Sequence, residues 1–162
     1  MKATIVLLAS IETENFGRKC MLKANKAAGL GFEMARLLHH ISLKQPFKIT
    51  DLNEVENIFD ELANEFKAVF VPFVQLDCFP SNIFGYESGV LSIRAEKTPE
   101  LEAMQKRLFG AKFENYINAH QLLKEKDYQK VFYFDRLGLL YYDDDNYKPG
   151  TYFCYKVAKL RE

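Results

Sequence analysis

The sequence predicts an α+β fold, in which short apolar strands are interspersed with amphipathic helices. Ala3–Ala9 is a continuous apolar run of the length of a buried strand. Leu52–Phe66 repeats apolar residues at three- and four-residue steps, as a helix does when one side faces a core. The 162 residues are 48% hydrophobic and 14% aromatic, which suffices for one domain, or for two small lobes that share a core.

The first half of the chain contains two further predicted elements. A helix is expected over Asn15–Ala28, because apolar residues lie along one side of it and Gly29 and Gly31 can end it. A strand is expected over Leu37–Leu43, before the helix that Thr50 or Asp51 can cap.

The second half of the chain shows the same pattern of strands and helices. Thr98 and Pro99 are typical of a helix start, with Thr98 as the N-cap and Pro99 at the first helical position. A loop with Pro80, Ser81 and Gly85 separates two strands before this helix. The expected strands are Val69–Leu76, Gly89–Ile93, Val131–Phe134, Leu137–Tyr142 and Tyr152–Leu160.

The segment Phe113–Lys126 fits two readings. As a strand it places Asn118, His120 and Leu122 on one face. As a helix it places His120 on a stripe with Tyr116 and Leu123. The functional prediction depends on which reading holds.

Charge and cysteine content restrict the partners and the compartment. Lysine plus arginine equals aspartate plus glutamate, at 22 each, so any nucleic-acid contact must be local, as with an RNA end or a small phosphorylated ligand. Cys20, Cys78 and Cys154 are widely spaced and odd in number, which favours reduced thiols in a cytoplasmic protein. The apolar runs are too short for a bilayer span, and the first is better explained as a buried strand than as a signal peptide.

The most informative segment for chemistry is His39–Phe47. On a strand, His40, Ser42 and Lys44 would face outward together while Ile41 and Leu43 face the core. This row presents an imidazole, a hydroxyl and an ammonium group. Such a row can bind a phosphate and transfer a proton.

This segment resembles the first signature of the two-histidine (2H) phosphoesterase superfamily, which includes 2′,5′ RNA ligase-like proteins and cyclic phosphodiesterases. That signature is His-x-Thr/Ser followed by leucine and often by Pro-Phe, and here His40, Ser42 and Leu43 occupy its positions. The family usually has proline where His39 stands, so His40 is the expected catalytic residue. The order of strands and helices extends the resemblance, as a pattern, over nearly the whole of residues 1–162.

The resemblance implies a single domain of two pseudo-symmetric lobes, each an antiparallel sheet with outer helices, around a central cleft. It implies metal-independent chemistry on a 2′,3′-cyclic phosphate or a 2′,5′-phosphodiester, with no cofactor and a monomeric protein. His40 and His120 would serve as acid and base. Ser42 would hold a non-bridging oxygen, and Lys44 would add positive charge.

The second signature departs from the family at one position. His120 stands where the second histidine is expected, but Leu122 replaces the threonine or serine that follows it. The site would therefore lose a hydroxyl, although Asn118 would share the strand face and could supply an amide donor.

Three other interpretations remain open. His40 can be an ordinary strand histidine. The fold can serve as a non-catalytic module that binds RNA ends or nucleotides, which Leu122 favours. An unrelated structural or interaction α+β domain stays open as a reading if Phe113–Lys126 is a helix.

Overall fold

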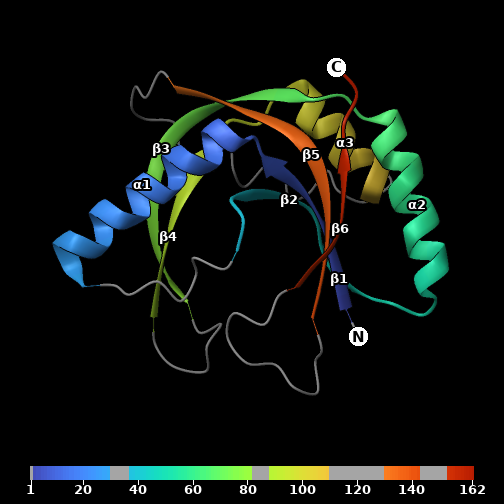
Figure 1. The fold of residues 1–162 in the computed structure, drawn as a ribbon, viewed down its shortest axis with the longest axis horizontal. Coiled ribbons are helices and arrows are strands. Elements are labelled where there is room, and N and C mark those ends of the chain that lie inside the picture. The colour runs from blue at the N-terminus through green and yellow to red at the C-terminus, as the bar shows by residue number, and fades with distance from the viewer. Residues whose placement is uncertain (1, 30–36, 82–87, 110–129, 143–152) are drawn as a thin grey trace. The chain divides into compact units, whose positions relative to one another are not determined.

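A computed structural model describes residues 2–29, 37–81, 88–109, 130–142 and 153–162 (Figure 1). These residues contain six strands, all antiparallel in the pairings described below, and three helices, which confirms the α+β class. The elements are β1 (Lys2–Ala9), α1 (Ile11–Ala28), β2 (His40–Lys48), α2 (Leu52–Glu65), β3 (Val69–Ser81), β4 (Ser88–Ala95), α3 (Pro99–Phe109), β5 (Lys130–Tyr142) and β6 (Phe153–Lys159). The chain divides into two compact units, 1–68 with 133–162, and 69–132.

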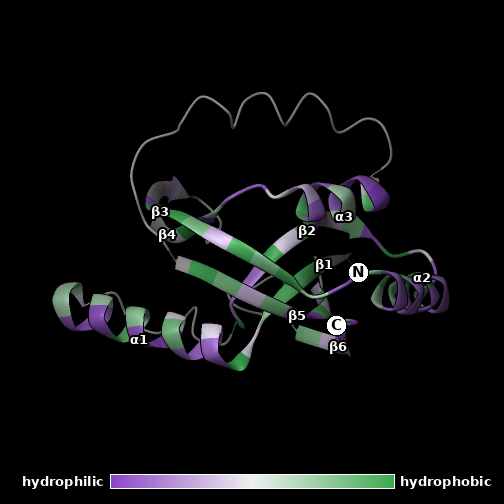
Figure 2. Cartoon of the chain, turned by 90° about the horizontal axis from the view of Figure 1, so that it is seen from above, coloured by the Kyte–Doolittle hydropathy of each residue, from purple (hydrophilic) through white to green (hydrophobic). Residues whose placement is uncertain are grey.

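The first unit is built around β1. This strand pairs with β2 on one side and with β5 on the other, and β6 pairs with β5. Every residue from Ala3 to Ala9 is buried, which confirms the predicted buried strand. β1 and β5 are largely apolar in Figure 2, whereas α1 and α2 carry polar residues along much of their length.

The helix α1 begins earlier than predicted because Ser10 caps it. The Ser10 hydroxyl accepts the Thr13 N–H at 3.3 Å, which satisfies one of the otherwise unpaired donors of the first turn. The helix ends at Gly29, whose φ of 62° is a left-handed conformation that glycine adopts without strain. The predicted stop at Gly29 is confirmed.

The helix α2 follows its sequence prediction closely. Asp51 caps it by accepting the N–H groups of Asn53 at 2.8 Å and Glu54 at 3.4 Å. Phe59, Leu62 and Ala63 are buried. The helix runs beside β6 (Figure 1), and Lys156 Nζ of β6 lies 2.7 Å from Asp60 Oδ2 of the helix.

The second unit contains β3, β4 and α3. β3 and β4 pair from Phe73 with Ala95 to Ser81 with Ser88, so Pro80 and Ser81 are strand residues and the predicted loop boundary was wrong. The Thr98 hydroxyl accepts the Leu101 N–H at 3.2 Å, as its predicted capping role requires. Leu101 and Met104 of α3 are buried.

Two other strand predictions need correction. β2 begins at His40 rather than at Leu37, because Leu37 and Leu38 precede the strand and pack on an apolar cluster. The two predicted strands on either side of Asp135 are a single strand, β5. It continues through a register shift at Asp135, so the polar pair Asp135–Arg136 does not end it.

Some predictions lie outside the described residues. These are the two readings of Phe113–Lys126 and the second glycine of the helix stop, Gly31. Within the described residues, no helix is long and apolar enough to cross a membrane.

Candidate functional site

The strand pairing places His40, Ser42 and Arg136 on one face of the first unit's sheet. Residues directly opposite each other in antiparallel strands point to the same face. Leu8 of β1 stands opposite His40 of β2 and opposite Arg136 of β5. Val6 stands in the same way opposite Ser42 and Gly138. We call this surface the His40 face.

The His40 face has an apolar base. Val6, Leu8 and Leu140 form a buried cluster, against which Leu37, Leu38 and Cys154 pack. Gly138 allows this packing, because an added Cβ would lie only 3.0 Å from side-chain atoms of Leu8 and Val6. The polar groups of the face therefore stand next to buried apolar side chains, and electrostatic contacts near such side chains are stronger than in water.

One hydrogen bond sets the proton position on His40. Its Nδ1 lies 2.7 Å from the main-chain oxygen of Leu38. A carbonyl oxygen only accepts, so Nδ1 carries the proton in the neutral ring. Nε2 then presents a lone pair, which is the group that a general base needs.

Burial keeps this imidazole neutral. Burial lowers the pKa of His40 from its ordinary value, and the hydrogen bond to Leu38 offsets this effect only in part. The neutral form therefore predominates at pH 7. The arrangement suits His40 to accept a proton rather than to donate one.

Ser42 lies two residues further along β2 on the same face and is exposed. Two strand residues on one face are roughly 7 Å apart. A phosphate group fits between an imidazole and a hydroxyl at that spacing. The predicted pairing of His40 with Ser42 on one face is consistent with this register.

The predicted extension of the row to Lys44 was wrong. The register shifts between Val6 and Ile5, so Lys44 pairs with Ile5 and lies on the opposite face from Ser42. Its Nζ lies 5.4 Å from the ring centroid of Phe47. The bulge adds one residue to β2 and ends the simple alternation that the prediction assumed.

Arg136 is a cation that the register places on the His40 face, where Lys44 was expected. It lies two strands from His40, or about 10 Å between main chains, with Leu8 between them. Its Nη2 donates to the main-chain oxygen of Ala9, and its Nε lies 3.5 Å from Asp135 Oδ1. The sequence signal was present as a charged pair, Asp135–Arg136, between two predicted strands, but no role was assigned to it.

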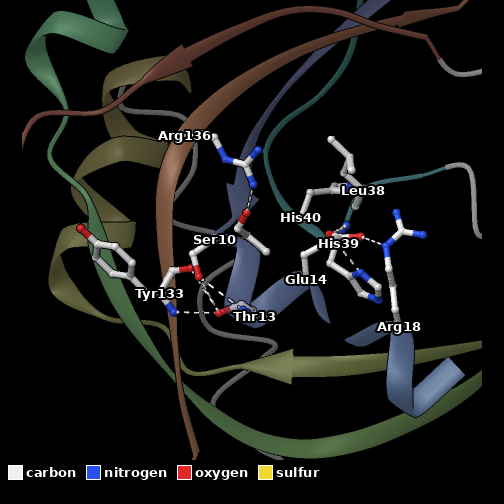
Figure 3. A network of polar contacts seen from close by, with 10 residues as sticks. Ser10, Thr13, Glu14, Arg18, Leu38, His39, His40, Tyr133 and Arg136 are labelled. Carbon is white, nitrogen blue, oxygen red and sulfur yellow. Dashed lines mark hydrogen bonds and ion pairs between the residues drawn. The ribbon is translucent and has the colours of Figure 1, made fainter. Parts of the chain in front are cut away.

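A second set of polar residues lies around His39, the residue before His40. Glu14 of α1 lies between His39 and Arg18 (Figure 3). Glu14 Oε2 accepts the main-chain N–H of His39 at 2.7 Å, and Arg18 Nε lies 2.8 Å from Oε1. The Nδ1 atom of His39 is 3.1 Å from Oε2.

The Glu14 carboxylate is ionised in this setting. Burial alone would raise its pKa, but the hydrogen bonds and charge of His39, together with the charge of Arg18, hold the pKa below its ordinary value. His39 and His40 thus turn to different partners. Among the described residues, no three histidine, cysteine or acidic side chains converge to hold a metal.

The remaining predicted site residues, Asn118, His120 and Leu122, lie outside the described residues. The second histidine of the expected pair is therefore still a prediction.

Comparison with known proteins does not assign a family. No family model matches the sequence, and no curated protein matches it. The features of the chain that point to a function are therefore the His40 face and the sequence resemblance.

Proposed function

We propose that this protein is a metal-independent phosphoesterase that acts on a 2′,3′-cyclic phosphate or a 2′,5′-phosphodiester of RNA or of a nucleotide. The observation that carries the proposal is the neutral His40, whose Nδ1 hydrogen is bound to Leu38 and which shares a face of the sheet with Ser42. The 2H resemblance supplies the substrate class.

The proposed hydrolysis of a cyclic phosphate assigns one step to each group. His40 Nε2 takes a proton from water as the water oxygen forms a bond to phosphorus. The bond from phosphorus to one ribose oxygen breaks, and that oxygen takes a proton from His120. Ser42 and Arg136 stabilise the negative charge on the non-bridging oxygens.

The proposal also includes the finer architecture that the resemblance implies. It consists of two pseudo-symmetric lobes around a central cleft, with His40 and His120 facing each other. A cytoplasmic monomer that binds an RNA end or a cyclic nucleotide fits the zero net charge, because its contacts need only be local.

The test is a turnover assay on 2′,3′-cyclic nucleotides and 2′,5′-linked oligonucleotides in EDTA, followed by phosphorus NMR. We expect turnover in the wild type and a loss of about 10²–10⁴-fold in His40→Asn, the range for removal of a general base. His120→Asn should lose activity to a similar extent. Lys44→Ala is the matched control and should keep full activity, because Lys44 lies off the His40 face.

Two results would overturn the proposal. One is activity that disappears in EDTA and returns with a divalent metal. The other is turnover that His40→Asn leaves unchanged.

A non-catalytic binding module is the second candidate, because Leu122 removes the hydroxyl of the second signature. This reading predicts that the wild type binds a 2′,3′-cyclic nucleotide without converting it, and that Arg136→Gln weakens the binding. Isothermal titration calorimetry with the same substrate panel separates the two functions.

A further inference from the structure

We infer that Glu14 is a positioning residue for His40, which it orients through the peptide bond between Leu38 and His39. The catalytic consequence of this inference rests on the proposed function, whereas the orientation itself does not. Glu14 is on α1 and touches neither ring nitrogen of His40 in the contacts described above.

The coupling passes through one planar group. The Leu38 carbonyl and the His39 N–H belong to the same peptide unit, which is trans and rigid. Glu14 Oε2 accepts the N–H at 2.7 Å, and the carbonyl on the other side of the unit faces His40 Nδ1 at 2.7 Å. Fixing the N–H therefore fixes the direction of the carbonyl, and the carbonyl determines which nitrogen of His40 carries the proton.

The next peptide unit is also held. The main-chain oxygen of His39 accepts the N–H of Ala9 at 3.0 Å. The main chain of His39 is thus bound at its N–H by a carboxylate and at its carbonyl by β1. His40 enters β2 with little rotational freedom.

The surroundings of Glu14 favour a charged acceptor at this place. The residue is only 9% exposed, and Arg18 pairs with it one helical turn away. An ionised carboxylate accepts a stronger hydrogen bond than a neutral amide does. The bond to the His39 N–H is therefore stronger than an ordinary main-chain bond.

Gly17 makes room for this arrangement on α1. A Cβ at Gly17 would lie 2.4 Å from Nε2 of His39, so the ring occupies the space that any other residue would fill. α1 can approach the segment before β2 closely enough for Glu14 to reach its main chain.

A simpler reading is that Glu14 only forms an ion pair with the ring of His39. The two readings differ for His39→Ala, which removes the ring and keeps the main-chain N–H. They differ also for Glu14→Met, which fills a similar volume and has no carboxylate.

The experiment is nitrogen-detected NMR of the histidine rings in the full chain, because it reports tautomer and pKa without any substrate. In the wild type we expect His40 to be protonated at Nδ1. In Glu14→Met we expect a substantial shift toward the tautomer protonated at Nε2, and in His39→Ala we expect the wild-type tautomer. An unchanged His40 tautomer in folded Glu14→Met overturns the inference, as does a change in His39→Ala equal to that in Glu14→Met.

Glu14→Gln covers the case in which Glu14→Met does not fold. It keeps an acceptor for the His39 N–H, but a neutral amide oxygen accepts a weaker hydrogen bond than the carboxylate does. We expect a smaller shift toward the tautomer protonated at Nε2, and a tautomer population identical to that of the wild type overturns the inference.

Kinetics separate this inference from the proposed function. If the wild type turns over, Glu14→Met should lower kcat by about 10- to 100-fold with KM little changed, by analogy with other partners that orient a functional imidazole. If the wild type shows no turnover, the proposed function fails and the NMR result still decides the role of Glu14.

Discussion

In the proposed reaction, His40 would act as a base without a charged partner on its ring. A carboxylate in contact with the ring would raise the pKa and favour the imidazolium form. Here Nδ1 of the ring contacts a neutral carbonyl, and the Glu14 carboxylate accepts the main-chain N–H of His39 instead. Burial then lowers the pKa, so that the base is available at neutral pH.

This arrangement predicts the acidic limb of the pH–rate profile. The neutral ring is the active form, so activity falls as pH drops through the pKa of His40. Because burial lowers that pKa, the midpoint of the limb in kcat/KM should lie below about 6.5, the ordinary value for histidine. Assays from acidic to weakly basic pH would show this, and a midpoint clearly above the ordinary value would contradict the assignment of His40 as the base.

The charge of Glu14 should make the free energy of unfolding depend on pH. Its folded-state pKa is depressed, so its contribution is fully present above the unfolded value of about 4.3 and is lost as pH falls through the lower folded value. Glu14→Gln should cost about 1–3 kcal/mol at pH 7, as expected for a hydrogen bond to a charged group. The cost should shrink in acid, and urea unfolding at neutral and acidic pH would measure it. An equal cost at both pH values would show that the charge is not responsible.

At the scale of elements, the sequence correctly predicted the features that depend on residues close together in the chain. The core stripe of α2, its cap at Asp51 and the cap of α3 at Thr98 are all properties of adjacent residues. The start of β2 and the continuity of β5 depend on which strands pair and where the register shifts. Those features are set by contacts between distant residues, so Lys44 was assigned to the wrong face and Arg136 was overlooked.

A side chain at Gly138 should destabilise the protein, because it would disturb the packing at the base of the His40 face. A Cβ there meets the Cγ and Cδ1 of Leu8 and the Cγ2 of Val6 at 3.0 Å. Both side chains are fully buried, so they can move little. Gly138→Ala should lower the free energy of unfolding by about 1–3 kcal/mol, the usual cost of overpacking.

Ser42→Ala is a matched control for this substitution. The Ser42→Ala substitution removes one atom from an exposed side chain on the same face of the sheet, opposite Val6. Its effect on the free energy of unfolding should therefore stay within about 0.5 kcal/mol. Urea unfolding of both variants makes the comparison. A neutral Gly138→Ala would mean that the apolar base of the face is loosely packed.

At the scale of the whole molecule, the proposed reaction needs groups from both signatures. His40, Ser42 and Arg136 supply a base, a hydroxyl donor and a cation. The acid is expected from His120, and the sequence places Leu122 where a second hydroxyl donor would stand. The protein should therefore be a weak catalyst, because one missing donor to the developing charge costs about 10²–10³ in rate.

This reasoning predicts a gain of activity from Leu122→Thr. If Phe113–Lys126 is a strand, the new hydroxyl shares a face with His120 and restores the donor, and threonine is favourable in a strand. Leu123→Thr is the matched control, since its side chain would alternate to the other face. Turnover of a 2′,3′-cyclic nucleotide should rise only in Leu122→Thr, and adding His40→Ala should abolish the gain.

The helical reading predicts the opposite result for the same substitution. If Leu122 is then a core residue, the hydroxyl is buried without a partner and costs about 1–3 kcal/mol of stability. A destabilised Leu122→Thr variant with no gain in turnover would remove His120 from the proposed acid role. The base on β2 would then have no proton donor to match it, which would leave binding without hydrolysis as the function that the His40 face supports.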